Sequence, residues 1–259
     1  MLIKLKETIC FLLIITLIFF VGIYDSNGTF SLGGVISVSA NENQAIEVIA
    51  VRKQLDKSKP MVALTFDDGP YAKTTSSILD TLEEHDVVAT FFVVGNRVNR
   101  YKDIVRRMAE TGNEIGNHSY NHKDLTILTS DQVKEQINMT QNVVSKVVGS
   151  KPKIMRPTYG AFNDDLKAQA KMPLILWSID SMDWKSQDAI KIIDLVLGKV
   201  RDGDIILMHD IFGATAEAVE YLVPELINRG FELVTVSELY ESRGRVLEVG
   251  NIYNRIYRR

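Results

Sequence analysis

The chain has 259 residues, 46% hydrophobic and 24% charged, enough to bury the core of one large domain or two small ones. This composition excludes a disordered or collagen-like chain, and a net charge of −3 removes the electrostatic basis for general nucleic-acid binding. A single cysteine, Cys10, excludes an intrachain disulfide and a structural zinc site built on two or more thiolates.

The N-terminal residues carry a membrane-targeting segment. Residues 9–24 form a nearly continuous apolar run with Lys4 and Lys6 before it, a charge pattern that keeps the N-terminus inside and predicts export of the rest. The length of the run fits both a signal peptide and a spanning anchor, and Ala40 follows small residues that suit signal-peptide cleavage. We therefore expect residues 1–40 to be a signal peptide or membrane anchor and residues 41–59 to be a polar connector.

Short β-rich apolar runs alternate with amphipathic helical stretches from Met61 onward, as in parallel βα units. Strands are predicted at residues 61–66, 89–94, 114–117, 154–156, 174–179, 204–208 and 232–235. Helices are predicted at residues 74–84, 102–111, 130–148, 164–170, 188–200 and 216–228. About seven parallel strands predict an α/β barrel that is short of the usual eight units, with an open doubly wound sheet as the alternative.

Ionisable residues follow five of the predicted strands. Both candidate folds place functional residues at the carboxyl ends of their strands, so these side chains are predicted to meet at one rim. In chain order the strands are followed by Asp67 and Asp68, by His118, by Arg156, by Asp180 and Asp183, and by His209.

Two motifs at this rim point to a bound metal. Asp67 and Asp68 are adjacent and cannot share one direction, which predicts two different tasks; the alternative is an acidic turn in which one Asp caps the next helix. His118 and His122 are four residues apart, a separation that suits a divalent metal on one face of a helical turn. A carboxylate from another strand end would complete a two-histidine, one-carboxylate set with open positions for water and substrate.

The remaining residues of the rim admit structural as well as functional interpretations. Arg156 could pair with any neighbouring acid, and His209 could be a structural histidine at the end of an apolar strand. Trp184 follows two acids in a loop, and its indole could stack on the apolar face of a sugar ring. His85 lies between two acids at a helix end and is interpreted as a surface residue without a catalytic role.

In combination and in order, five motifs resemble a known family. They are TFDDGP at 65–70, HSYNH at 118–122, RPTYG at 156–160, DSMDW at 180–184 and LMH at 207–209. The sequence resembles the polysaccharide deacetylases with a NodB-like domain, carbohydrate esterase family 4. The resemblance runs from about residue 60 to residue 239, and Thr158 departs mildly from it because relatives commonly have a proline there.

The resemblance implies a fold and a metal site. The fold would be a deformed (β/α) barrel, in agreement with the predicted strands. One divalent metal ion, most commonly Zn²⁺ in this family, would be bound by Asp68, His118 and His122.

The resemblance also implies catalytic roles. Asp67 would be the general base, held in place by Arg156, and His209 would be the general acid, oriented by Asp183. The implied substrate-binding residues are Tyr159, whose backbone N–H would donate to the oxyanion, and Trp184 and Leu207, which would wall the pocket for the acetyl methyl group.

The reaction implied is hydrolysis of the N-acetyl group of N-acetylglucosamine in cell-wall peptidoglycan, which releases acetate. Export would place the enzyme beside that polymer, either anchored in the membrane and facing outside or secreted to the cell wall. Another acetylated glycan, such as acetylxylan or a chitin oligomer, is the alternative within the same chemistry. A catalytically silent wall-binding module is the alternative of a different class.

The catalytic domain would span residues 60–240 and be followed by a basic C-terminal tail, residues 241–259. The tail has five arginines against two glutamates. Its simplest interpretation is a solvated, flexible segment. The alternative hypothesis is that it holds the enzyme to anionic wall polymers.

Overall fold

The computed structural model describes residues 23–24, 30–32, 36–39, 47–50 and 55–256, and the chain divides into two compact units, Met1–Leu55 and Asp56–Arg259. The first unit holds an antiparallel sheet of four strands: β1 (Ile23–Tyr24), β2 (Phe30–Leu32), β3 (Ile36–Ser39) and β4 (Glu47–Ala50). The sequence predicted a targeting segment and a connector here, and no strands.

The apolar run at residues 9–24 falls almost wholly outside the described residues, which contain only Ile23 and Tyr24 of it. Within the part of the chain that the structure describes, no helix combines the length and the apolar character needed to cross a membrane. Targeting and export therefore stay predictions.

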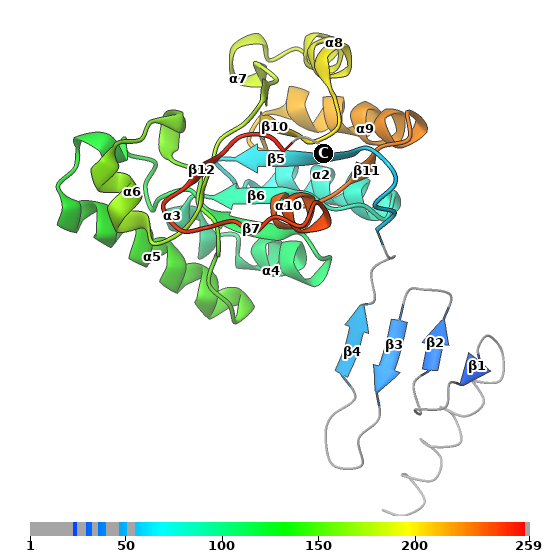
Figure 1. The fold of residues 1–259 in the computed structure, drawn as a ribbon, viewed down its shortest axis with the longest axis horizontal. Helices are drawn as coiled ribbons and strands as arrows, with labels where there is room; N and C mark the ends of the chain where they lie inside the picture. The colour runs from blue at the N-terminus through cyan, green and yellow to red at the C-terminus, as the bar shows by residue number, and fades with distance from the viewer. Residues whose placement is uncertain (1–22, 25–29, 33–35, 40–46, 51–54, 257–259) are drawn as a thin grey trace, which may run out of the picture. The chain divides into compact units, whose positions relative to one another are not determined.

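The second unit is an α/β fold in which helices alternate with mostly parallel strands (Figure 1). Its strands are β5 (Met61–Asp67), β6 (Thr90–Val93), β7 (Glu114–Asn117), β8 (Leu174–Ile175), β9 (Ile179–Asp180), β10 (Asp204–His209), β11 (Glu232–Leu233) and β12 (Ile252–Tyr253). Its helices are α2 (Ala72–Glu84), α3 (Gly95–Val98), α4 (Lys102–Glu110), α5 (Ser130–Val148), α6 (Asp164–Ala170), α7 (Asp183–Ser186), α8 (Ala189–Lys199), α9 (Gly213–Asn228) and α10 (Val236–Ser242), with short 3₁₀ turns at Leu125–Ile127 and Thr158–Gly160.

The sheet has the order β7-β6-β5-β10-β9, and β11 pairs with the first residues of β5. Strand β5 is buried along its whole length, as expected of a parallel strand covered on both faces. The parallel register pairs Asp67 with His209 on β10 and with Phe92 on β6. Because β6 in turn pairs Val93 with Asn117, His118 follows at the same edge. The register thus gathers the predicted rim residues at the carboxyl end of the sheet.

The fourth and fifth predicted strands are shorter than expected. Residues 154–156 contribute only isolated bridges at Met155, to Asn117 and to Leu174, because Pro157 has no N–H to continue the ladder. Residues 174–179 split into β8 and β9. The Arg156 side chain explains the gap, since its Nε and Nη2 donate to the carbonyl oxygens of Ile175 and Leu176.

The predicted helices form, and the strongest local signals give the sharpest boundaries. Helix α5 has the predicted range, with Thr129 as its N-cap in a capping box with Gln132. The strand predicted at residues 232–235 ends at Leu233, because Thr235 instead caps α10 in a second capping box, with Glu238. Helices α3, α7 and α10 were not predicted; α3 and α7 have four residues each and α10 has seven.

The C-terminal segment is part of the second unit, so its interpretation as a solvated tail is wrong for the residues described. Strand β12 pairs in parallel with β8, and Ile256 donates its N–H to the Gly203 carbonyl. Of the three arginines that the structure describes in this segment, Arg243 forms an ion pair with Asp202 and Arg255 with Asp204. These contacts leave fewer free charges for wall polymers than the sequence suggested.

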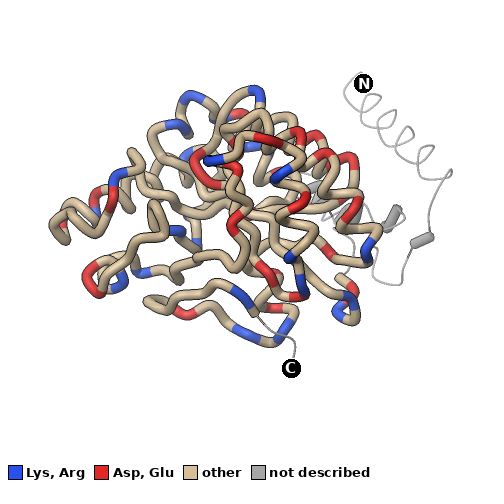
Figure 2. The backbone as a smooth tube through the Cα atoms, turned by 90° about the horizontal axis from the view of Figure 1, so that it is seen from above, with Lys and Arg blue, Asp and Glu red and all other residues tan. Residues whose placement is uncertain are grey.

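The main core lies between the sheet and its covering helices. Helix α9 packs against α2 and α8, and α4 packs against α2 and α5, so these helices form one continuous layer over the sheet. Among the described residues, one large cluster of buried apolar side chains includes Phe66, Phe91, Leu79 and Leu222. Lys and Arg are interspersed with Asp and Glu along the backbone (Figure 2), in keeping with the small net charge. This packing fixes the strand ends on which the site is built.

Candidate active site

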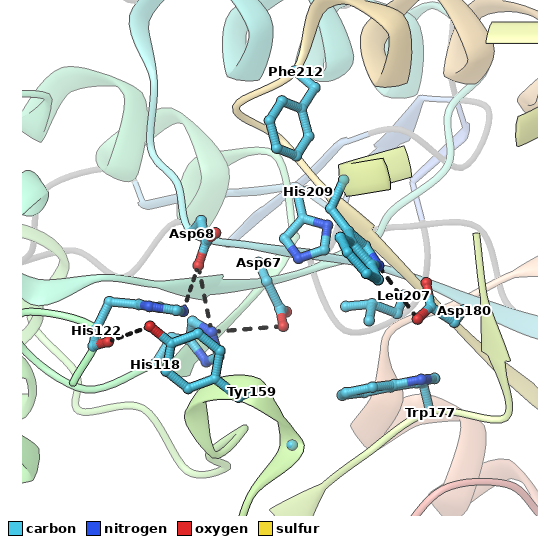
Figure 3. A pocket seen from close by; sticks show the side chains of 12 residues that line it. Asp67, Asp68, His118, His122, Tyr159, Trp177, Asp180, Leu207, His209 and Phe212 are labelled. Atoms are coloured by element: carbon cyan, nitrogen blue, oxygen red, sulfur yellow. Dashed lines mark hydrogen bonds and ion pairs between the residues drawn. The ribbon is translucent and has the colours of Figure 1, made fainter. Parts of the chain in front are cut away.

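A pocket of about 370 Å³ opens at the carboxyl ends of the parallel strands (Figure 3). Eight of the ten predicted site residues line it: Asp67, Asp68, His118, His122, Tyr159, Trp184, Leu207 and His209. The other two, Arg156 and Asp183, are buried behind the pocket with no exposed surface. All ten residues thus come together, and His85, in contrast, ends α2 outside the pocket.

Asp67 is held by a buried arginine. The Nη1 atom of Arg156 donates to Asp67 Oδ1 at 2.8 Å and to Thr65 Oγ1 at 2.8 Å. The guanidinium also lies 4.2 Å from the centroid of the Phe92 ring. Oδ1 is taken by Arg156, and the other carboxylate oxygen, Oδ2, lies 3.7 Å from His118 Nε2. The pair fixes one carboxylate oxygen and leaves the other toward the pocket.

Asp68, His118 and His122 form a cluster that fits a divalent metal. One ligand atom from each of the three lies within 4.8 Å of the other two. Asp68 Oδ1 is 3.0 Å from His122 Nε2 and 3.5 Å from His118 Nε2 (Figure 3). Three donors from two separate loops with one open side are the arrangement of a catalytic rather than a structural metal site.

Hydrogen bonding and burial prepare these ligands. His118 Nδ1 donates to the Arg156 carbonyl oxygen at 2.8 Å, which leaves the Nε2 lone pair directed at the cluster. Burial lowers the pKa of His118, so its imidazole is neutral as a metal ligand must be. Burial opposes ionisation of Asp68, but the His122 hydrogen bond and the nearby His118 outweigh it and lower the pKa of Asp68 to about 2.

His209 lies across the pocket from the cluster and is oriented by Asp183. Its Nδ1 is 2.8 Å from Asp183 Oδ1, and its backbone N–H donates to Asp183 Oδ2 at 2.6 Å. Asp183 Oδ2 also accepts from Thr215 Oγ1 at 2.7 Å. Burial would lower the pKa of His209, but the hydrogen bond and charge of Asp183 prevail and raise it to about 9. His209 is therefore protonated at neutral pH.

The open side of the pocket is lined by aromatic side chains. The ring of Tyr159 meets the His122 ring edge-on with a centroid distance of 4.7 Å. Tyr159 has a positive φ of 59°, and Gly160 follows with a φ of 65°. A Cβ at Gly160 would lie 2.7 Å from the Trp177 ring, so the glycine lets the loop pack directly on that indole.

Sequence reasoning missed three residues that line the pocket or orient its members: Trp177, Phe212 and Thr215. Trp177 was placed inside a continuous strand, where an aromatic residue suggests only core. Phe212 and Thr215 belong to the loop and first turn that follow His209. The available signal was that both residues follow His209 closely in the sequence, but only the fold shows which way their side chains face.

Asp210 was also missed, and it supports the Asp67–Asp68 turn from behind. Its buried carboxylate accepts from Thr75 Oγ1 at 2.6 Å. A Cβ added at Gly69 would lie 2.0 Å from Asp210 Oδ2, so only glycine fits this contact. Burial, with the charges of Asp68 and Asp67, raises the pKa of Asp210 to about 7.

Comparison with known proteins places this site in a family. The model of the polysaccharide deacetylase domain matches residues 54–174. The chain is 44% identical over 197 residues to the peptidoglycan-N-acetylmuramic acid deacetylase PdaC of Bacillus subtilis (strain 168), a match that covers 75% of this chain and 42% of PdaC. It is 36% identical over 192 residues to a peptidoglycan-N-acetylglucosamine deacetylase of Bacillus cereus, covering 71% of this chain and 70% of that protein.

A solved structure supports the same grouping. The chain is 37% identical, with a TM-score of 0.72, to a family 4 acetyl xylan esterase from Clostridium thermocellum solved in complex with a cobalt ion. The match covers 76% of this chain and 98% of that one. This chain spans less than half the length of PdaC but about the whole of the esterase domain. The resemblance predicted from the five motifs is confirmed, and the chain belongs to the polysaccharide deacetylase family.

Proposed function

We propose that this protein is a metal-dependent hydrolase that removes N-acetyl groups from the sugars of cell-wall peptidoglycan and releases acetate. The observation that carries the proposal is the pairing of Asp67 with His209 across β5 and β10, beside the Asp68, His118 and His122 cluster. N-acetylglucosamine is the expected sugar. N-acetylmuramic acid is the second candidate, because PdaC, which is 44% identical, is named for that sugar.

Asp68, His118 and His122 would hold one divalent ion, which we propose to be Zn²⁺. One carboxylate oxygen and two imidazole nitrogens are ligands that suit zinc, and a related esterase binds cobalt. When bound, such an ion polarises a carbonyl group and can lower the pKa of water from about 15.7 toward 7.

Asp67 and His209 would move the protons. The Asp67 oxygen left free by Arg156 would take a proton from the attacking water. His209, protonated at neutral pH, would deliver one to the leaving amine. Asp183 would hold the His209 ring so that Nε2 faces the leaving group, because Nδ1 is bonded to its carboxylate.

The walls of the pocket would bind the acetyl group and the sugar. The backbone N–H of Tyr159 would donate to the oxyanion of the tetrahedral intermediate. Leu207 and Trp184 would surround the methyl group. The Trp184 Nε1 lies 3.5 Å from Asp180 Oδ2, and this contact would fix the orientation of the indole at the rim.

The strand pairings and bridges of the second unit support the deformed barrel that the family resemblance implies.

The N-terminal segment and the deacetylases named above support action outside the cell, next to the wall. A membrane anchor or a cleaved signal at residues 1–40 would bring the enzyme there. The alternative within the same chemistry is an acetylxylan esterase, favoured by the likeness to the Clostridium enzyme.

Acetate release from matched substrates tests the proposal. The purified protein, loaded with Zn²⁺, is incubated with peptidoglycan, with N-acetylglucosamine oligomers and with acetylxylan at equal acetyl content. We expect the highest kcat/KM on peptidoglycan. A higher kcat/KM on acetylxylan would identify an esterase instead, and no acetate from any of the three would refute the deacetylase assignment.

A further inference from the structure

The rim beside the pocket carries an aromatic and basic surface that the catalytic proposal does not use. It consists of Tyr71, which follows the Asp67–Asp68 turn, and of Arg97, Arg100 and Tyr101 around the end of α3; we call it the basic aromatic rim. The rings of Tyr71 and Tyr101 are 6.2 Å apart at an angle of 59°. The Arg100 guanidinium lies 5.3 Å from the centroid of the Tyr101 ring.

This surface is attached directly to both loops of the metal cluster. Val94 donates its N–H to the Gly69 carbonyl at 2.9 Å, next to Asp68. Gly95 and Asn96 donate to the carbonyls of Ser119 and Tyr120 at 3.0 and 2.8 Å, inside the His118–His122 loop. Helix α3 therefore begins against the cluster, and a polymer whose acetylated sugar enters the pocket can extend over this surface.

The charge of the basic aromatic rim is opposite to that of the pocket. Residues 69–79 and 94–102 contain no Asp or Glu, and they contribute Lys73 and Lys102 as well as the two arginines. Among the described residues, neither Arg97 nor Arg100 has a carboxylate ion-pair partner, and the following acid, Asp103, is bonded to Arg106. In contrast, the described residues that line the pocket include three aspartates and no Lys or Arg.

Two features suit the rim to an anionic ligand attached to a sugar. A guanidinium presents parallel N–H donors that match a carboxylate. Because Arg100 already stacks over Tyr101, its side chain would lose less conformational entropy on binding. Tyr71 is 46% exposed, so its ring has a face free to pack on a sugar.

We propose that the basic aromatic rim binds a carboxylate-bearing substituent on the glycan, next to the sugar that occupies the pocket. The inference rests on the proposed function and deepens it, since it selects among acetylated polymers. Peptidoglycan carries carboxylates on its peptides, and on its lactyl ethers where the peptide has been removed, whereas chitin is uncharged. The rim would thus favour the wall polymer by charge, as rim charges commonly set specificity in recognition.

The test compares one glycan fragment in two charge states. A peptidoglycan tetrasaccharide with free lactyl carboxylates and the same fragment with these groups converted to amides are given to the wild-type protein and to the Arg97→Gln/Arg100→Gln variant. The matched control is Lys146→Gln/Lys153→Gln, which removes two exposed charges outside the pocket and the rim. Binding of both fragments is also measured in an Asp67→Asn background, so that recognition is read without turnover.

We expect the arginine variant to raise KM for the free-carboxylate fragment about tenfold, with kcat unchanged and no effect on the amide. The difference from wild type should disappear in about 1 M salt, where surface charges are screened. The same KM increase on both fragments, or the same increase in the lysine control, would overturn the inference. If the wild type releases no acetate, the proposed function fails, while charge-selective binding that is lost in the arginine variant would still support the rim.

Discussion

At the level of single residues, the site depends on side chains whose other polar atoms are already hydrogen-bonded within the protein. Arg156 uses its Nε, Nη1 and Nη2 atoms on two carbonyls, Thr65 and Asp67, so it cannot turn away from Asp67. Asp183 likewise accepts from His209, Thr215 and the Trp184 N–H. Each reactive group therefore has one free atom, and that atom faces the pocket.

The raised pKa of His209 makes a pH prediction. A proton donor with a pKa of about 9 is available below that pH, so kcat/KM should fall as pH rises through about 9. Asp183→Asn removes the carboxylate that raises the pKa, so the alkaline limb should move down by at least a pH unit. Asp188→Asn, which changes a partly exposed helix cap outside the pocket, should leave the limb in place.

The same pair has a stability counterpart. Because the folded-state pKa of His209 is raised, the ion pair stabilises the fold fully below the unfolded pKa of about 6.5 and loses this effect as pH rises through 9. The difference in unfolding free energy between wild type and Asp183→Asn should follow that course in urea titrations. Two results would contradict the pairing: an alkaline limb that stays in place in Asp183→Asn, or a difference in unfolding free energy that does not change with pH.

At the scale of elements, the turn after β5 is supported by the residue after β10. The Asp210 backbone N–H donates to the Asp67 carbonyl at 3.3 Å, and its carboxylate packs on Gly69. Adjacent parallel strands thus fix the turn that bears both aspartates of the site.

A double-mutant cycle tests this support. Gly69→Ala places a methyl group 2.0 Å from Asp210 Oδ2 and should destabilise the fold by about 1–3 kcal/mol through overpacking. Asp210→Ala should be destabilising alone but should relieve part of the clash, giving a coupling energy of about 1 kcal/mol or more in urea unfolding. Strictly additive effects would show that the two residues do not press on each other.

The elements also show what the sequence could and could not predict. The strand ends were predictable because the alternation of strands and helices can be read from local sequence patterns. Parallel strands place functional residues at their carboxyl ends, and this rule predicted that Asp67, His118 and His209 lie together. The break between β8 and β9 was not, because it depends on hydrogen bonds from Arg156, nineteen and twenty residues away. Asp210 escaped notice for the same reason, since its partner Thr75 lies 135 residues away.

At the scale of the whole molecule, the C-terminal segment secures the second unit. Strand β12 adds to β8, and the Tyr240 hydroxyl donates to the Arg255 carbonyl at 3.1 Å. The Arg255 side chain meets Asp204, whose side chain has no exposed surface. The basic composition of this segment suggested a free tail, but composition does not reveal that Arg255 pairs with the buried Asp204.

Removing that arginine should destabilise the unit. Arg255→Met leaves a buried carboxylate without its cation and should cost about 3 kcal/mol in unfolding free energy. Arg245→Met removes an equal charge from an exposed position and should cost less than about 0.5 kcal/mol. Chemical denaturation of both variants at pH 7 compares them directly, and equal costs would argue that the ion pair has no structural weight.

We propose that Asp67 acts as a base beside a metal held by Asp68, His118 and His122. The deciding measurement is acetate release from peptidoglycan together with bound Zn²⁺ per chain, for wild type, Asp67→Asn and His118→Ala. We predict that Asp67→Asn keeps its zinc and loses activity by about 10²–10⁴-fold, while His118→Ala loses both. An Asp67→Asn protein that stays folded, keeps its zinc and turns over at the wild-type rate would show that Asp67 is not the base.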